Sequence, residues 1–178
     1  AIVEGSNWNI WSSSCKMGAH NFNIYASSGD TMISAGQTVK IKKNPSMVGE
    51  LVIDRGGAKS GSRSRHFFVY GGKLEVDGVT LKGGYANGGG AVGIVTGSGT
   101  FTMVVFKGNT AVSSNGGGAL YFEPGGFATF ISCSWTGNSA TNEGNDIYIK
   151  SGGSGSIKII NSRTTMDIKG STSKIATC

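Results

Sequence analysis

The sequence is poor in proline, cysteine, histidine and charge. Its 178 residues include 2 prolines, 3 cysteines and 2 histidines, and charged residues make up 15%. No apolar run is long enough to span a bilayer, and residues 66–178 contain no window with the spacing of an amphipathic helix. The cysteines and histidines lack metal-ligand spacing, so neither a metal site nor a cofactor is expected.

Glycine is the residue in excess, at 31 of 178 positions. Ordinary glycine usage is about 7%. The glycines follow no Gly-X-Y period, which excludes collagen, and the hydrophobic residues, at 38%, are patterned, which argues against disorder. Because glycine suits positions where the backbone turns tightly or approaches another segment closely, the composition predicts one domain of short segments and tight turns.

One short pattern occurs three times and predicts the fold. It reads Leu81-Lys82-Gly83-Gly84, then Phe106-Lys107-Gly108-Asn109, then Trp135-Thr136-Gly137-Asn138. The copies lie about 25 to 29 residues apart, and a unit that cannot bury its own apolar face must stack on its neighbours. The segments between them are short, β-branched and aromatic, and are bounded by Gly, Asn and Ser. The sequence therefore predicts an all-β fold, a β-solenoid.

Each position of the repeat has an expected structural role. The large apolar residues should point inward and stack from coil to coil: Leu81, Phe106 and Trp135. The asparagines should form a ladder of side-chain amides: Asn109 and Asn138. The glycines should sit where the backbone bends most sharply: Gly83, Gly108 and Gly137.

The whole chain, residues 1–178, is predicted to be a single β-helix domain. Residues 1–36 are expected to form an irregular N-terminal cap, because a terminal coil needs a cover. Residues 37–70 are interpreted as degenerate coils with a basic loop at 56–65 that leaves the solenoid. Residues 71–161 are the regular repeats, and 162–178 a last coil or cap.

The three cysteines divide by position. Cys133 occupies an alternating strand position inside the third repeat and is predicted to be a buried free thiol. Cys15 and Cys178 lie in the two terminal segments, and they can form a disulfide only if the ends of the solenoid meet.

Phe106-x-x-Asn109 together with Gly117-Gly118-Ala119-Leu120 resembles the paired repeat signature of chlamydial polymorphic outer-membrane proteins. Trp135-x-x-Asn138 matches the first half with Trp for Phe, Gly89-Gly90-Ala91-Val92 matches the second half, and Gly84 departs at the Asn. The resemblance covers about residues 71–161 and extends to large surface proteins of algae and other protists. It implies a right-handed parallel β-helix. In the bacterial family such repeats serve as adhesin passenger domains, which makes an adhesin-like role an analogy for this chain.

Enzymes built on parallel β-helices often act on acidic polysaccharides with clustered carboxylates and an Arg, Lys or His base. Glu75 and Asp77 are two apart on a predicted strand and share one face. With Arg65 and His66 nearby in sequence, they are the candidate catalytic residues of an alternative hypothesis, a polyuronate lyase or epimerase. The simpler interpretation is a solvated strand face and a packing histidine.

The basic residues favour a binding function. The net charge is +6, and seven cations form two groups along the chain: Lys40, Lys42, Lys43, Arg55, Lys59, Arg63 and Arg65. Such groups attract an acidic protein, an acidic glycan or an anionic membrane surface. A solvated charged loop is the plainer alternative. Nucleic acid is not expected, because aromatic residues do not alternate with the cations.

The leading hypothesis is a non-catalytic structural or binding β-helix, either an accessory subunit that docks on a larger assembly or an adhesin-like module. We expect a location outside the cytosol, at a cell surface, in a periplasm or in an organelle lumen, with peripheral membrane association possible. Ice binding is a further alternative, because Thr100 and Thr129 are equivalent in the repeat, as are Thr110 and Ser139.

Overall fold

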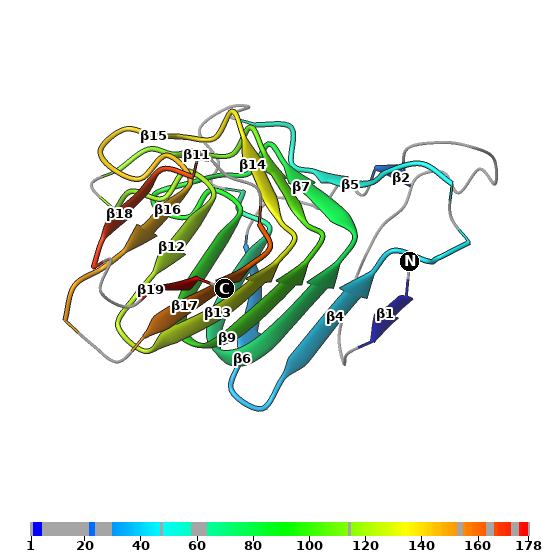
Figure 1. Ribbon diagram of the computed structural model, residues 1–178, viewed down its shortest axis with the longest axis horizontal. Helices are drawn as coiled ribbons and strands as arrows, with labels where there is room; N and C mark the ends of the chain where they lie inside the picture. The colour runs from blue at the N-terminus through cyan, green and yellow to red at the C-terminus, as the bar shows by residue number, and fades with distance from the viewer. Residues whose placement is uncertain are drawn as a thin grey trace.

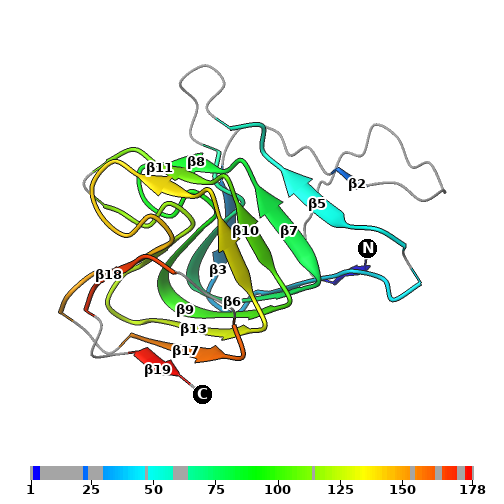
Figure 2. The ribbon, with the colours of Figure 1, turned by 45° about the horizontal axis from the view of Figure 1, so that its top comes forward.

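The computed structural model describes residues 2–4, 22–23, 30–46, 48–57, 64–113, 115–152, 155–162, 166–171 and 175–177. Every regular element among these residues is a β-strand. No helix that could cross a membrane is found in these segments. The strands wind into a parallel β-helix of about four turns, which confirms the predicted fold class. Figures 1 and 2 show this winding.

Each turn of the chain, here called a coil, runs over four sides. The first side carries β3 (Thr31–Ser34), the start of β6 (Phe67–Asp77), the start of β9 (Val92–Thr102), β12 (Leu120–Phe122), β16 (Ile147–Ile149) and β18 (Ile168–Gly170). The second side carries β1 (Ile2–Glu4), β4 (Thr38–Lys42), the remainder of β6 and β9, β13 (Gly126–Ile131), β17 (Ser156–Ile160) and β19 (Ile175–Thr177). The third side carries β2 (Phe22–Asn23), β5 (Leu51–Asp54), β7 (Val79–Lys82), β10 (Val105–Lys107) and β14 (Ser134–Thr136). The short fourth side carries β8 (Tyr85–Ala86), β11 (Thr110–Ala111) and β15 (Ser139–Ala140).

Two short strands from the predicted N-terminal cap lie against the first coil. Strand β1 pairs antiparallel with β4, and β2 pairs parallel with β5. Both cover strand edges that would otherwise be open to another chain. Strand β3 pairs with β6, so the first coil begins at Thr31, before the predicted boundary at residue 37. Cys15 and Cys178 lie outside the described residues.

The interior is apolar and is filled by the residues that the repeat predicts. Leu81, Phe106 and Trp135 are register partners on β7, β10 and β14, and the Phe106 and Trp135 rings stack 5.6 Å apart. Phe101 and Phe130 stack at 5.1 Å on the facing side and meet Phe106 edge to face. These offset and perpendicular contacts add to the apolar burial that holds successive coils together.

Cys133 is buried and free, as predicted. Its Sγ lies 3.2 Å from the carbonyl oxygen of Phe101. Burial raises the pKa of this thiol to about 11, despite backbone hydrogen bonds that lower it, so the thiol is protonated at neutral pH.

A ladder of asparagine side chains runs along the inside of one corner, as the repeat predicts. Asn109 donates from Nδ2 to the carbonyl of Leu81 and to Oδ1 of Asn138, each at 3.0 Å. Asn138 donates in turn to the carbonyl of Phe106 at 3.1 Å and to Oδ1 of Asp146 at 2.9 Å. Both asparagines are buried. The ladder therefore pairs backbone groups at a corner where water does not reach them.

The glycines of the repeat stand at the bend before the ladder. Gly83, Gly108 and Gly137 have φ values of 65°, 60° and 62°. This left-handed conformation is open to glycine and strained for most other residues, so the predicted bend positions are confirmed.

The corner between the second and third sides is also left-handed, but it does not use glycine in every coil. Met103 has φ 50°, and the equivalent residues of the other coils are Gly78, Ser132 and Asn161. A methionine held there stores backbone strain that an asparagine, which tolerates this region, does not.

Loss of a ladder amide is expected to destabilise the whole solenoid. Asn138→Ala removes the buried N–H donors to Phe106 and Asp146 and the Oδ1 that accepts from the backbone and side chain of Asn109. We expect the free energy of unfolding to fall by about 2–4 kcal/mol, measured by denaturant titration. Asn115→Ala, at an exposed position, is the control and should change it by less than about 0.5 kcal/mol. Equal effects of the two substitutions would contradict a structural ladder.

Relief of the Met103 strain is expected to stabilise the protein. Met103→Asn should raise the free energy of unfolding by about 0.5–1 kcal/mol, because asparagine is less strained in the left-handed region. The matched control is Met32→Asn, another exposed methionine, which lies in strand β3. Thermal unfolding distinguishes the two: a gain at Met32 or a loss at Met103 would show that strain is not the cause.

Candidate binding surface

The outward side chains of the second side form a face that we call the outer face. The alternation along each strand sends one set of residues into the core and leaves the other set outside. The outer face comprises Thr38, Lys40 and Lys42 of β4, Lys73, Glu75 and Asp77 of β6, Ser98, Thr100 and Thr102 of β9, Phe127, Thr129 and Ile131 of β13, and Ser156, Lys158 and Ile160 of β17. Figure 1 shows these strands side by side.

Ion pairs occupy the first half of the outer face. Glu75 and Asp77 lie on one face of β6, as predicted, and each is joined to a lysine of β4. Lys40 Nζ lies 3.3 Å from Glu75, and Lys42 Nζ lies 3.3 Å from Asp77. These pairs are exposed and each contributes at most about 1 kcal/mol. Their effect on the surface is larger, because they cancel the charge of two predicted partner-binding residues.

The second half of the outer face is apolar and hydroxylated, and sequence reasoning did not single it out. Phe127 is 44% exposed near the start of β13, and the register partners Ile131 and Ile160 are half-buried at the other end of β13 and β17. Met103, at the adjoining corner, is 57% exposed. The sequence does contain a signal for it. Strands β13 and β17 have apolar residues at their inward positions and further apolar residues at outward positions, where polar residues are expected.

Two lysines remain without an ion pair on the described outer face. Lys73 and Lys158 are exposed, on β6 and β17, and neither contacts a carboxylate among the described residues. Both carboxylates of the face, Glu75 and Asp77, are already paired. The outer face thus combines an apolar strip with a net positive charge.

The threonine row on this face is short. Thr100 and Thr129 are register partners, but Glu75 precedes them and Lys158 follows them in the same row. Thr110 and Ser139 also pair, with their hydroxyls 3.3 Å apart, and Tyr85 precedes them. Neither row extends over more than two coils of hydroxyl residues.

Arg65 and His66 lie at the other end of β6, away from Glu75 and Asp77. They directly precede the first residue of β6, whereas Glu75 and Asp77 end it on the second side. A strand rises about 3.3 Å per residue. The four residues of the enzyme hypothesis are therefore not brought together in one cluster.

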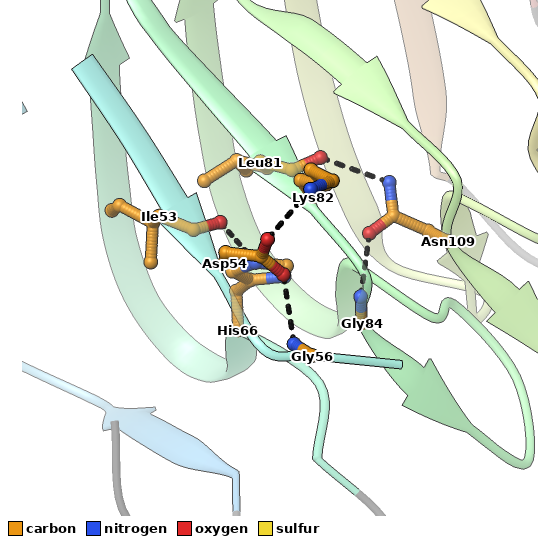
Figure 3. A network of polar contacts seen from close by, with 8 residues as sticks. All are labelled: Ile53, Asp54, Gly56, His66, Leu81, Lys82, Gly84 and Asn109. Carbon is orange, nitrogen blue, oxygen red and sulfur yellow. Dashed lines mark hydrogen bonds and ion pairs between the residues drawn. The ribbon is translucent and has the colours of Figure 1, made fainter. Parts of the chain in front are cut away.

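His66 is inside the solenoid and is 1% exposed. Its Nε2 lies 3.0 Å from the carbonyl of Ile53, so Nε2 carries the proton and donates. Figure 3 shows the ring beside Asp54, whose carboxylate accepts from Gly56 N and Lys82 Nζ, each at 2.8 Å. Burial, and then the charge of Arg55, lowers the pKa of His66 to about 3, although Asp54 and backbone carbonyls favour the charged ring. His66 is neutral at physiological pH.

Two arginines of the predicted basic group, Arg55 and Arg65, are held by contacts within the fold. Arg65 Nε lies 3.1 Å from Asp30 and is 8% exposed, and Arg55 donates to the carbonyl of His66 at 3.3 Å. The charge of Asp30 also reaches Arg55. Lys43 is half-buried at the end of β4. Lys59 and Arg63 lie outside the described residues.

The described residues contain no group of three or more His, Cys, Asp or Glu side chains that could hold a metal ion. No family model, no curated protein and no solved structure matches the chain. The resemblance to the chlamydial repeats therefore stays a prediction.

His66 makes the stability of the protein depend on pH. A folded pKa near 3, below the ordinary value of 6.5, means that the unfolded chain takes up a proton first. The contribution of His66 is complete above about pH 6.5 and is lost as the pH falls toward 3, by up to about 1.4 kcal/mol per pH unit. Denaturant titrations between pH 7 and 5 measure it, above the range where carboxylates titrate.

The variant His66→Gln keeps a donor for Ile53 and cannot titrate, so its stability should be nearly flat over that range. His20→Gln removes the other histidine and serves as the control. An unchanged slope in His66→Gln, or a slope abolished by His20→Gln, would assign the pH dependence elsewhere.

Proposed function

We propose that this protein is a non-catalytic binding β-helix that docks through its outer face on an acidic protein surface, as an accessory subunit or an adhesin-like module. The observation that supports the proposal is that the outer face carries exposed Phe127 and two lysines without an ion pair among the described residues, with exposed Met103 at the corner that adjoins it. Exposed apolar side chains gathered on one surface are typical of protein interfaces.

The chemistry of the face indicates the class of partner. Apolar side chains of a partner cover Phe127, Ile131 and Met103, and burial of each large side chain contributes about 1.5–3 kcal/mol. Carboxylates of the partner pair with Lys73 and Lys158, which lie three strands apart on the face, about 14 Å across the sheet. An acidic glycan also has carboxylates that can pair with the two lysines, but it has no apolar side chains to cover Phe127, Ile131 and Met103. The outer face therefore favours an acidic protein.

The basic loop at 56–65 is a second contact in this proposal. Lys59 and Arg63 are the cations of this group that we propose for binding. Arg55 and Arg65 make contacts within the fold instead. Such charges chiefly raise the rate of encounter with an acidic partner and the dependence of binding on salt.

Charge reversal on the outer face is expected to weaken binding to an acidic polypeptide. The probe is a random copolymer of glutamate and tyrosine, which supplies carboxylates and aromatic rings. We expect the double variant Lys73→Glu/Lys158→Glu to lose at least tenfold in affinity at low salt, about 1.4 kcal/mol. The double variant Lys107→Glu/Lys169→Glu, at exposed lysines of the third and first sides, carries the same change in net charge and should lose less than twofold. Equal losses would show that only net charge matters.

The glycan alternative is tested with the same protein and polygalacturonate. Phe127→Ser should weaken binding to the copolymer and leave any binding to polygalacturonate unchanged, because only the polypeptide covers the ring. Tighter binding of wild-type protein to polygalacturonate than to the copolymer, or release of unsaturated sugar products, would overturn the proposed function in favour of the polysaccharide enzyme.

A further inference from the structure

Gly57 and Ser64 are the described residues on either side of positions 58–63, and both are bonded to the next coil. Gly57 N donates to the carbonyl of Gly83 at 2.8 Å, and Ser64 N donates to the carbonyl of Tyr85 at 2.7 Å. Ser64 forms an antiparallel bridge with Tyr85 in a fold whose coils otherwise pair in parallel. The two residues after this bridge point to opposite sides of the wall.

His66 points inward and occupies a position in the amide ladder. Asn138 donates to the carbonyl of Phe106, and Asn109 donates to the carbonyl of Leu81. His66 donates to the carbonyl of Ile53, and Ile53 is the register partner of Leu81, which is the register partner of Phe106. The imidazole therefore makes the bond that the asparagine makes in each later coil. Figure 3 shows His66 and Asn109 in these equivalent places.

Gly84 explains why a side chain from elsewhere is needed. It stands where the repeat has Asn109 and Asn138, and it has no side chain to offer. A Cβ at this position would lie 2.0 Å from the carbonyl oxygen of Gly90 and 2.9 Å from Nδ1 of His66. The backbone of this coil thus excludes the asparagine, and the imidazole fills the space that it would take.

Arg65 points outward and fills a second gap. Phe68, Gly93, Tyr121 and Tyr148 follow one another in register on the first side, and the Tyr121 and Tyr148 rings are stacked 6.0 Å apart at 2°. Gly93 interrupts this row. The guanidinium of Arg65 lies 4.6 Å from the centre of the Phe68 ring, and a Cβ at Gly93 would lie 2.3 Å from its Nη1. Its ion pair with Asp30 holds it in that place.

We propose that Arg65 and His66 form a two-sided anchor that fastens residues 64–66, which directly precede β6, to the wall of the solenoid. His66 replaces the missing ladder amide inside, and Arg65 replaces the missing aromatic ring outside. The anchor fixes the position at which the chain enters β6. It stands on contacts independent of the outer face, so it does not depend on the proposed function.

Backbone hydrogen exchange of the full chain tests the anchor residue by residue. His66→Phe keeps a planar ring and removes the donor to Ile53. We expect exchange of the Gly57, Ser64 and His66 amides to rise at least tenfold, while the Ser134 and Ser139 amides of later coils stay within twofold. His66→Gln supplies an amide donor at similar reach and should restore protection to within about threefold of wild type.

Arg65 is tested separately with Arg65→Met, which keeps the stem and removes the guanidinium. It should raise exchange at Ser64 at least tenfold, whereas Arg65→Lys, which keeps a charge for Asp30 but not the planar group, should give an intermediate value. A uniform rise over all coils in His66→Phe, or equal exchange in His66→Phe and His66→Gln, would show that His66 only fills space and would overturn the anchor. So would unchanged exchange at Ser64 in Arg65→Met.

Discussion

Burial of backbone polar groups at the fourth-side corner is the constraint on which the rest of this solenoid depends. The chain turns there from the third side to the fourth side. The backbone carbonyls of Ile53, Leu81 and Phe106 lie near this turn and accept hydrogen bonds from buried side chains. One side chain per coil satisfies them, and the row ends at Asp146, which accepts from Asn138 and from the backbone of Asp167. Each of these three carbonyls receives a donor from a side chain of the next coil, and loss of a hydrogen bond to a buried polar group costs about 1–3 kcal/mol. The chain supplies this donor from its own repeat twice and from His66 once.

Close packing of backbone on backbone is the second requirement of the same corner. A Cβ at Gly118 would lie 2.1 Å from the carbonyl oxygen of Asn145, and one at Gly90 would lie 2.4 Å from that of Gly118. The glycine-rich step after each repeat is therefore explained by contact between neighbouring coils, in addition to turn geometry. This is also why the excess of glycine does not signal disorder: these glycines lie where two coils touch.

The features that repeat from coil to coil were predictable from the sequence. The side chains that substitute for a missing repeat residue were not. The repeat identifies the stacked apolar residues, the ladder asparagines and the bend glycines. The structure places them as the repeat predicts: Leu81, Phe106 and Trp135, Asn109 and Asn138, and Gly83, Gly108 and Gly137. His66 and Arg65 act only once, across a loop, and compensate for glycines at positions 84 and 93. Their proximity in sequence to Glu75 suggested chemistry, but β6 separates them along its length. Likewise, the pairing of Lys40 with Glu75 depends on a register between coils that the irregular spacing of the first coil hides.

The outside of the solenoid follows a different rule from the inside. Inward positions of the second side are apolar from β4 to β17 except at Gly99, where the side chains of Phe101 and Ile94 occupy the space. Outward positions in one row run from Lys40 through Glu75, Thr100 and Thr129 to Lys158, with no stacking requirement that selects them. Phe127 is exposed near the start of β13 and contributes little to the core, and Met103 at the left-handed corner is less favourable than the glycine or asparagine found there in other coils. Such residues are not selected by the packing of the fold, and the proposed binding function would account for them.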